Sequence, residues 1–133
     1  HMNTFFAYVA TIIPLAVLDT VWLMFVAKGF YSTHMSFLFS KTVNFTPVLF
    51  FYPIYAFVVL MLVVMPAVAA NSWVEALWRG ALLGLAAYGA YDLTNHATIA
   101  GWPLKMTLVD MGWGVVVTAL TSVIAYFIIS HFK

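Results

Sequence analysis

The sequence predicts an all-α integral membrane protein, a four-helix bundle whose N- and C-termini lie on the same side of the bilayer. Composition is the first observation: of the 133 residues, 65% are hydrophobic and only 7% are charged, and the mean hydropathy is +1.05. Soluble domains carry roughly 25% charged residues, so this chain has too few charged residues for a surface that is exposed to water. The second observation is that four segments each supply the roughly 20 apolar residues that a transmembrane helix needs.

The expected transmembrane spans cover residues 3–27, 45–69, 75–96 and 104–129. The first span is not expected to be a cleaved signal peptide, because it lacks a basic leading region, is too long and contains an aspartate. No linker or low-complexity stretch divides the chain, so residues 1–133 are expected to form a single transmembrane domain, with His1 interpreted as a cloning scar. The expected connections are a polar loop at residues 28–44, a turn at Asn71-Ser72-Trp73 and a short loop at Gly101-Trp102-Pro103.

The basic residues predict the orientation in the membrane. Lys28, Lys41 and Lys105 lie in or beside the first and third loops, whereas Arg79 and Lys133 lie on the other side. Cytoplasmic loops carry an excess of lysine and arginine. The first and third loops are therefore expected to be cytoplasmic, and both termini to lie outside.

Small residues and prolines predict how the spans pack. Ala76, Gly80 and Gly84 form a small-xxx-small stripe along the third span, and glycines in the fourth span are expected to allow the same close approach. These fourth-span glycines are Gly112 and Gly114. Two prolines inside spans, Pro14 and Pro53, are expected to kink their helices.

Three of the four acidic residues, Asp19, Asp92 and Asp110, lie inside apolar spans. The fourth, Glu75, lies at a helix start, where the helix dipole favours a carboxylate. A charged aspartate at the centre of a transmembrane helix costs about 2.5–3.5 kcal/mol, so such residues normally face the protein interior and have partners. All three are displaced toward the side of the first and third loops. This predicts a polar, aspartate-lined pocket near that interface, with all three as candidate catalytic acids or bases.

Neighbouring side chains are the candidate substrate-binding residues. Tyr88, Tyr91 and Asn95 share one helical face with Asp92 at spacings of three and four. Asn95 and Trp102 are expected to orient a substrate, and Lys105 to attract an anionic headgroup. Two further candidates, Trp22 and Trp113, each follow an aspartate by three residues, so that each D-x-x-W pair sets an indole N–H one turn from a carboxylate. The alternative is that the aspartates only hydrogen-bond such donors and fix the helix register.

Several stretches are distinctive: "LDTVWL", "GFY", "FFYPIY", "GALLGLAAYGAYDLTNHAT" and "GWPLKMTLVDMGWG". Together they resemble a bacterial family of small, four-span inner-membrane proteins of unknown function, and the similarity covers nearly the whole chain. The resemblance implies the bacterial inner membrane and a link to lipid-modifying enzymes beside which members are encoded, including cyclopropane-fatty-acid-synthase-like and flavin-dependent proteins. The resemblance does not imply any particular activity. Asp19, Asp92, Asn95 and Asp110 fall on the family pattern, whereas members usually have an apolar residue at the position of His96.

Three classes of function stay open. The first is a membrane enzyme or enzyme subunit that acts on a lipid; no catalytic nucleophile motif is present, so the sequence does not decide whether the protein is an enzyme. The second is an accessory protein that binds a lipid, pigment or partner, and the third is a proton-coupled or cation transporter. The second is suggested by aromatic residues in the first loop and second span, namely Phe37, Phe39, Phe45, Phe50, Phe51, Tyr52 and Tyr55.

Other classes of site are not indicated. The chain has no cysteine, which excludes disulfides and thiolate ligands, and its net charge of +1 gives no signal for nucleic acid. His34 and His96 do not form a motif with metal-ligand spacing, so no metal is expected. A cofactor is not identified. The expected partners are membrane lipids, with a second copy of the chain or a partner membrane enzyme left open.

Overall fold

The computed structural model describes residues 3–27, 29–30, 33 and 46–133. As the sequence predicts, the described chain is built from four helical segments. Expectations that concern Lys28, His34, Phe37, Phe39, Lys41 and Phe45 lie outside the described residues. The elements are α1 (Thr4–Trp22) continued by η1 (Leu23–Ala27), α3 (Thr46–Val59) continued by η3 (Leu60–Val64) and α4 (Met65–Ala69), α5 (Trp73–Thr98), and α6 (Leu104–Phe132).

The first two segments change helix type along their length. Asn3 caps α1, its Oδ1 accepting the backbone N–H of Phe5 at 2.7 Å. The stretches η1 and η3 are π-helical, which the sequence did not predict. Pro14 and Pro53 lie inside helices that continue past them. The hydroxyl of Tyr8 donates to the carbonyl of Pro53 at 3.0 Å and so ties α1 to α3.

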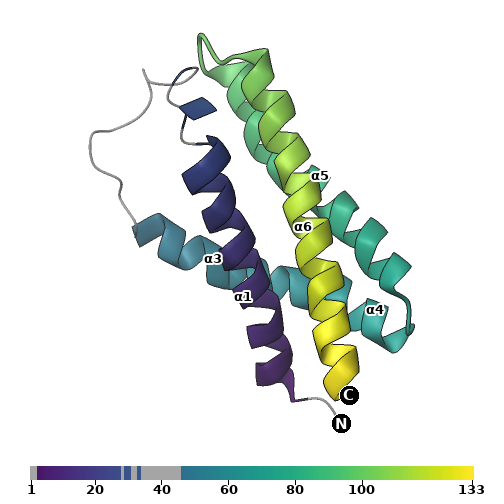
Figure 1. The fold of residues 1–133 in the computed structure, drawn as a ribbon. Coiled ribbons are helices and arrows are strands. Elements are labelled where there is room, and N and C mark those ends of the chain that lie inside the picture. Colours follow the sequence, from purple (N-terminus) through teal and green to yellow (C-terminus); the bar gives the residue numbers. More distant parts are fainter. Residues whose placement is uncertain (1–2, 28, 31–32, 34–45) are drawn as a thin grey trace.

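The segments pack around α6, which contacts α5, α1 and η3. Figure 1 shows α5 and α6 running side by side in opposite directions, with α1 beside α6. The segment from α3 to α4 crosses behind α1 and α6 at a steep inclination (Figure 1). The rings of Phe6 and Phe132 lie 5.5 Å apart, so the start of α1 and the end of α6 are neighbours.

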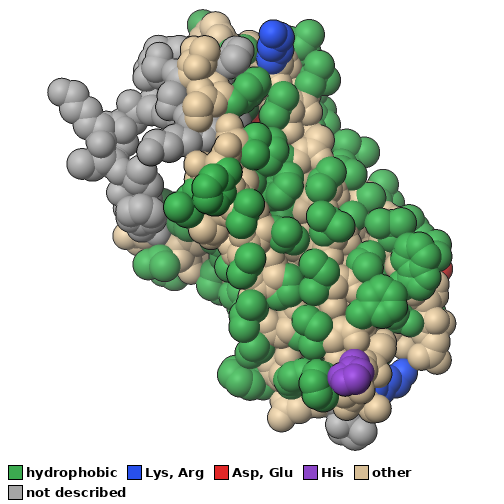
Figure 2. All heavy atoms as spheres, in the orientation of Figure 1, with side chains coloured by type: hydrophobic (Ala, Val, Ile, Leu, Met, Phe, Trp, Pro, Cys, Tyr) green, Lys and Arg blue, Asp and Glu red, His purple; other side chains and the backbone are tan. Residues whose placement is uncertain are grey.

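Three segments are long and apolar enough to cross a membrane: Thr4–Val26, Thr46–Ala69 and Leu104–Phe132. The helix α5 has 26 residues, which is long enough, but it carries Glu75, Arg79 and Asp92 and is less apolar. Its crossing of the bilayer stays a prediction. Figure 2 shows hydrophobic side chains spread over the visible face and lysine or arginine side chains only at its two ends, the distribution expected for a protein in lipid.

Glycines bring the backbones of α5 and α6 together. A Cβ atom on Gly80 would lie 2.9 Å from Ala119 Cα, and one on Gly84 would collide with the carbonyl oxygen of Gly114. A Cβ atom on Gly114 would collide with the ring of Tyr88. The small-residue prediction is thus confirmed for these glycines. It was wrong for Gly112, which has no neighbour within 4 Å of its Cβ position because it faces away from α5.

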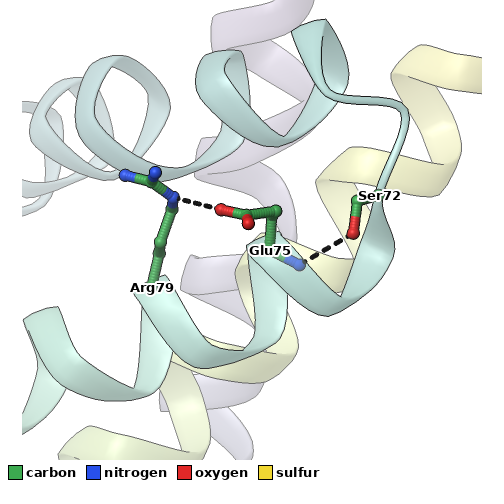
Figure 3. Close-up of polar contacts among 3 residues, drawn as sticks. All are labelled: Ser72, Glu75 and Arg79. Carbon is green, nitrogen blue, oxygen red and sulfur yellow. Dashed lines mark hydrogen bonds and ion pairs between the residues drawn. The ribbon is translucent and has the colours of Figure 1, made fainter.

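The turn between α4 and α5 lies where the sequence predicted it. Asn71 adopts a positive φ of 52°, and the Ser72 hydroxyl caps α5 by accepting the backbone N–H of Glu75 at 3.2 Å (Figure 3). Glu75 lies in the first turn of α5, and its Oε2 accepts from Arg79 Nε at 2.6 Å (Figure 3). The Lys133 ammonium reaches the same turn and donates to Asn71 Oδ1 at 3.3 Å.

Candidate functional site

A cavity of about 470 Å³ lies between the later part of α1, the first turns of α3, the later part of α5 and the start of α6. Its wall is mostly apolar and aromatic, with a few polar groups, which is the usual make-up of a small-molecule site. The described residues that line it are Asp19, Pro47, Val48, Phe51, Tyr52, Ala87, Tyr88, Tyr91 and Asp110.

Asp19 is fixed by a tryptophan of another helix. Its side chain is buried, and its Oδ1 accepts the indole N–H of Trp113 at 2.8 Å. The rings of Trp22 and Trp113 are stacked, 4.5 Å apart with 5° between their planes. The indole of Trp113 thus reaches across to the aspartate of α1, although Asp110 lies one turn away on its own helix.

Asp110 connects the three aspartates. It lines the cavity, and its carboxyl group interacts electrostatically with the carboxyl groups of Asp19 and Asp92. Asp92 lies next to Asp110 but does not line the cavity, and its side chain is 0% exposed. Neither carboxyl oxygen of Asp92 accepts a hydrogen bond from an N–H or hydroxyl donor among the described residues, and its polar neighbour is the carboxyl group of Asp110. Such a group is expensive to bury, so its retention calls for an explanation other than packing.

Aromatic rings form much of the cavity wall. Phe51 stacks on Tyr55 at 5.2 Å with 15° between the rings, and Tyr55 contacts Tyr88 edge to face at 6.3 Å. The Tyr55 hydroxyl is hydrogen-bonded to Thr118 Oγ1 at 2.7 Å, which fixes the tyrosine that supports both wall residues. Tyr91 meets Trp102 edge to face at 6.1 Å.

The remaining candidates lie outside the cavity wall. The indole of Trp102 is buried and donates to Thr107 Oγ1 at 3.1 Å, and Thr107 is hydrogen-bonded in turn to His96 Nδ1 at 3.0 Å. Trp102 therefore closes the α5–α6 connection and supports Tyr91. Asn95 neighbours the Tyr91 side chain, and Lys105 is exposed on the first turn of α6.

No group of three or more histidine or acidic side chains that could hold a metal ion occurs within the described parts of the chain. The sequence profile of the family described as "Predicted membrane protein (DUF2177)" matches residues 4–127. The chain belongs to this family. It is a family of membrane proteins of unknown function, which agrees with the apolar helices of the structure. No curated protein and no solved structure matches the chain significantly.

Sequence reasoning missed five of the lining residues as site residues. Pro47, Val48, Phe51 and Tyr52 come from the start of α3, and Ala87 from α5. The signal for Ala87 was available, because it precedes Tyr91 by four residues and so lies on the same helical face. Phe51 and Tyr52 belong to the aromatic residues that suggested lipid binding, but no signal placed the start of α3 beside the aspartates, since its position depends on the inclination of α3 against the other helices.

Proposed function

We propose that this family member binds a membrane amphiphile in the cavity between α1, α3, α5 and α6, for chemical modification of that lipid by this protein or by a partner enzyme. The observation that carries the proposal is the combination of an apolar wall with two carboxyl groups, those of Asp19 and Asp110, in one cavity of about 470 Å³. Such a cavity accommodates a polar group and the first part of an apolar chain.

The exposed rim of the cavity supports entry from the lipid. Three lining side chains are also open to the surroundings, with Val48 38%, Phe51 44% and Tyr91 59% exposed. Val48 and Phe51 belong to a helix that is apolar enough to cross the membrane. A lipid can therefore reach the carboxyl groups sideways, without leaving the bilayer.

The aspartates give the proposed site its chemistry. Asp19 accepts the indole N–H of Trp113 with one carboxyl oxygen and lines the cavity, where its carboxyl group can meet a ligand. Asp110 interacts electrostatically with both Asp19 and the buried Asp92. We assign Asp110 to proton transfer with the bound polar group and Asp92 to holding a proton next to it, because adjacent carboxyl groups differ in protonation when they share a site.

Filling the cavity tests the binding proposal. Ala87→Phe places a ring in the cavity, whereas Ala86→Phe adds the same ring at the neighbouring position, whose side chain is exposed and does not line it. We expect mass spectrometry of co-purified lipids to show a species that is enriched on the wild type and on Ala86→Phe, and reduced about tenfold or more on Ala87→Phe. Equal lipid profiles for the two phenylalanine variants would contradict the proposal, provided that both keep the wild-type melting temperature.

A whole-membrane lipid comparison separates modification from binding alone. The host would express the wild type, Asp110→Asn or an empty vector. A lipid species that changes with the wild type and returns to the vector level with Asp110→Asn identifies chemistry at the site. An unchanged lipidome with a retained lipid on the purified protein identifies a binding or accessory role.

A proton-coupled or cation transporter is the second candidate function. It is favoured by buried hydroxyl groups that continue along α6 beyond Asp110, at Thr118, Thr121 and Ser122. The Thr121 hydroxyl has no hydrogen-bond partner among the described residues. Proteoliposomes with an internal pH-sensitive dye decide this candidate: a flux that Asp110→Asn abolishes would favour transport over lipid binding.

We place the protein in the bacterial inner membrane with the first and third loops cytoplasmic. Under this orientation the cavity lies toward the cytoplasmic side, because its α6 lining residue Asp110 is six residues after the N-terminus of α6. A soluble or membrane-bound partner enzyme could then meet the lipid at that face. Labelling of single cysteines introduced at Gly101 and Asn71 in intact cells tests the orientation, since Gly101 should be protected and Asn71 accessible from outside.

A further inference from the structure

We propose that the polar group held in the cavity is an organic ammonium group, so that the ligand is a cationic or zwitterionic amine-bearing amphiphile. The inference rests on the proposed function and narrows it to one ligand chemistry. It follows from which side chains line the cavity, which rings are held in place and where the basic residues are.

The wall of the cavity combines aromatic rings with carboxyl groups. Four of its nine described lining residues are aromatic, namely Phe51, Tyr52, Tyr88 and Tyr91, and two are aspartates. The faces of aromatic rings attract cations, and cages of several rings are a recurrent binding site for quaternary ammonium groups. Carboxyl groups add charge complementarity to the rings. An anionic headgroup is disfavoured by this combination, and a neutral polyol gains hydrogen bonds from the carboxyl groups but no attraction between opposite charges.

Residues behind the cavity wall hold three of its aromatic rings in place in the absence of a ligand. Phe51 rests on Tyr55, whose hydroxyl is anchored to Thr118, and the ring of Tyr88 lies directly over the bare backbone of Gly114. Tyr91 is supported by Trp102, which is buried and hydrogen-bonded. A cage that is ordered in advance loses little entropy on binding, which favours a specific site over a loose apolar hollow.

The charge around the cavity is acidic among the described residues. None of its described lining residues is lysine, arginine or histidine, and the two carboxyl groups that line it belong to Asp19 and Asp110. The described lysine and arginine side chains lie outside the cavity wall: Arg79 pairs with Glu75, Lys133 reaches the turn before α5, and Lys105 is exposed on the first turn of α6. A phosphate or carboxylate headgroup without an amine would therefore enter against like charge.

A set of short amphiphiles with one tail and different headgroups tests the ligand chemistry. Hexyltrimethylammonium, hexylammonium, hexyl glucoside and hexyl phosphate would be titrated into the purified full chain in a mild non-ionic detergent. Binding would be followed by intrinsic tryptophan fluorescence, since Trp22 and Trp113 are stacked beside Asp19. We expect the two ammonium probes to bind about tenfold or more tightly than the glucoside, and the phosphate to be weakest.

Variants show that the signal comes from this cavity. Asp110→Asn and Phe51→Leu should each weaken hexyltrimethylammonium binding about tenfold while changing hexyl glucoside binding less than about twofold. Glu75→Gln is the matched acidic control, and Phe50→Leu, whose side chain is 67% exposed and does not line the cavity, is the matched aromatic control. If Asp110→Asn does not fold, the comparison of Phe51→Leu with Phe50→Leu is sufficient to test the inference.

The outcomes separate this inference from the proposed function. Equal binding of all four hexyl probes, lost in Ala87→Phe, would overturn the ammonium inference and leave the amphiphile site standing. Absence of binding for every probe would overturn both. Tetramethylammonium, which has no tail, separates the sources of the ammonium group: weaker binding than hexyltrimethylammonium supports a lipid ligand, and equal binding supports a free organic cation in the same cage.

Discussion

Gly84→Ala is expected to lower the free energy of unfolding by about 3 kcal/mol or more, because a single added methyl group has nowhere to go. A Cβ atom at this position would collide with the carbonyl oxygen of Gly114 and lie 2.9 Å from Thr118 Oγ1. The obstacle is largely backbone, so no rotamer change relieves it and the helices α5 and α6 must separate. Their separation would also disturb Tyr88, whose ring covers Gly114, and Thr118, which anchors Tyr55.

The measurement is the thermal unfolding of the purified protein in detergent, followed by tryptophan fluorescence. Gly112→Ala is the matched control on α6, since its Cβ position has no neighbour within 4 Å. Alanine is a better helix former than glycine by about 1 kcal/mol, so this control should be neutral or slightly stabilising. If both variants unfolded at the wild-type temperature, the close approach of α5 and α6 would be wrong.

Much of the fold follows from local sequence. Apolar runs of sufficient length predicted the helices, and the polar cluster Asn71-Ser72-Trp73 predicted the turn because Ser72 caps α5. The π-helical stretches η1 and η3 were not predicted. Both lie in runs of apolar residues, "LMFVA" and "LMLVV", in which no side chain marks a change of helix type.

Less of the site could be predicted, because the sequence does not determine how each helix is rotated about its own axis. The sequence placed the three aspartates toward one end of the protein, and the structure brings Asp19 and Asp92 each within electrostatic reach of Asp110. It could not tell which indole meets which carboxyl group, because helices that are apolar nearly all round do not encode which face turns inward. Trp113 therefore reached Asp19 rather than its own helix's aspartate.

Asp92→Ala is expected to raise the free energy of unfolding by about 1 kcal/mol or more, an unusual result for a fully buried residue. Its side chain is 0% exposed, and neither carboxyl oxygen accepts a hydrogen bond from an N–H or hydroxyl donor among the described residues. Removing the carboxyl group therefore removes a desolvation cost and the repulsion from the Asp110 carboxyl group, against the loss of the contact that a protonated Asp92 makes with Asp110. Since alanine is also the better helix former, the small cavity left behind does not reverse the sign.

Asp19→Ala is the matched variant with the opposite expected result. It leaves the indole N–H of Trp113 without its acceptor at 2.8 Å, which costs about 1–3 kcal/mol. Asp19→Asn keeps an acceptor oxygen and should lie near the wild type. Thermal unfolding of the three variants thus separates a structural carboxyl group from one retained for function. Asp92→Ala should be the most stable of them and should also lose any lipid change seen with the wild type, the trade-off expected at a functional site. A fall in stability for Asp92→Ala as large as that for Asp19→Ala would show instead that Asp92 holds the bundle together.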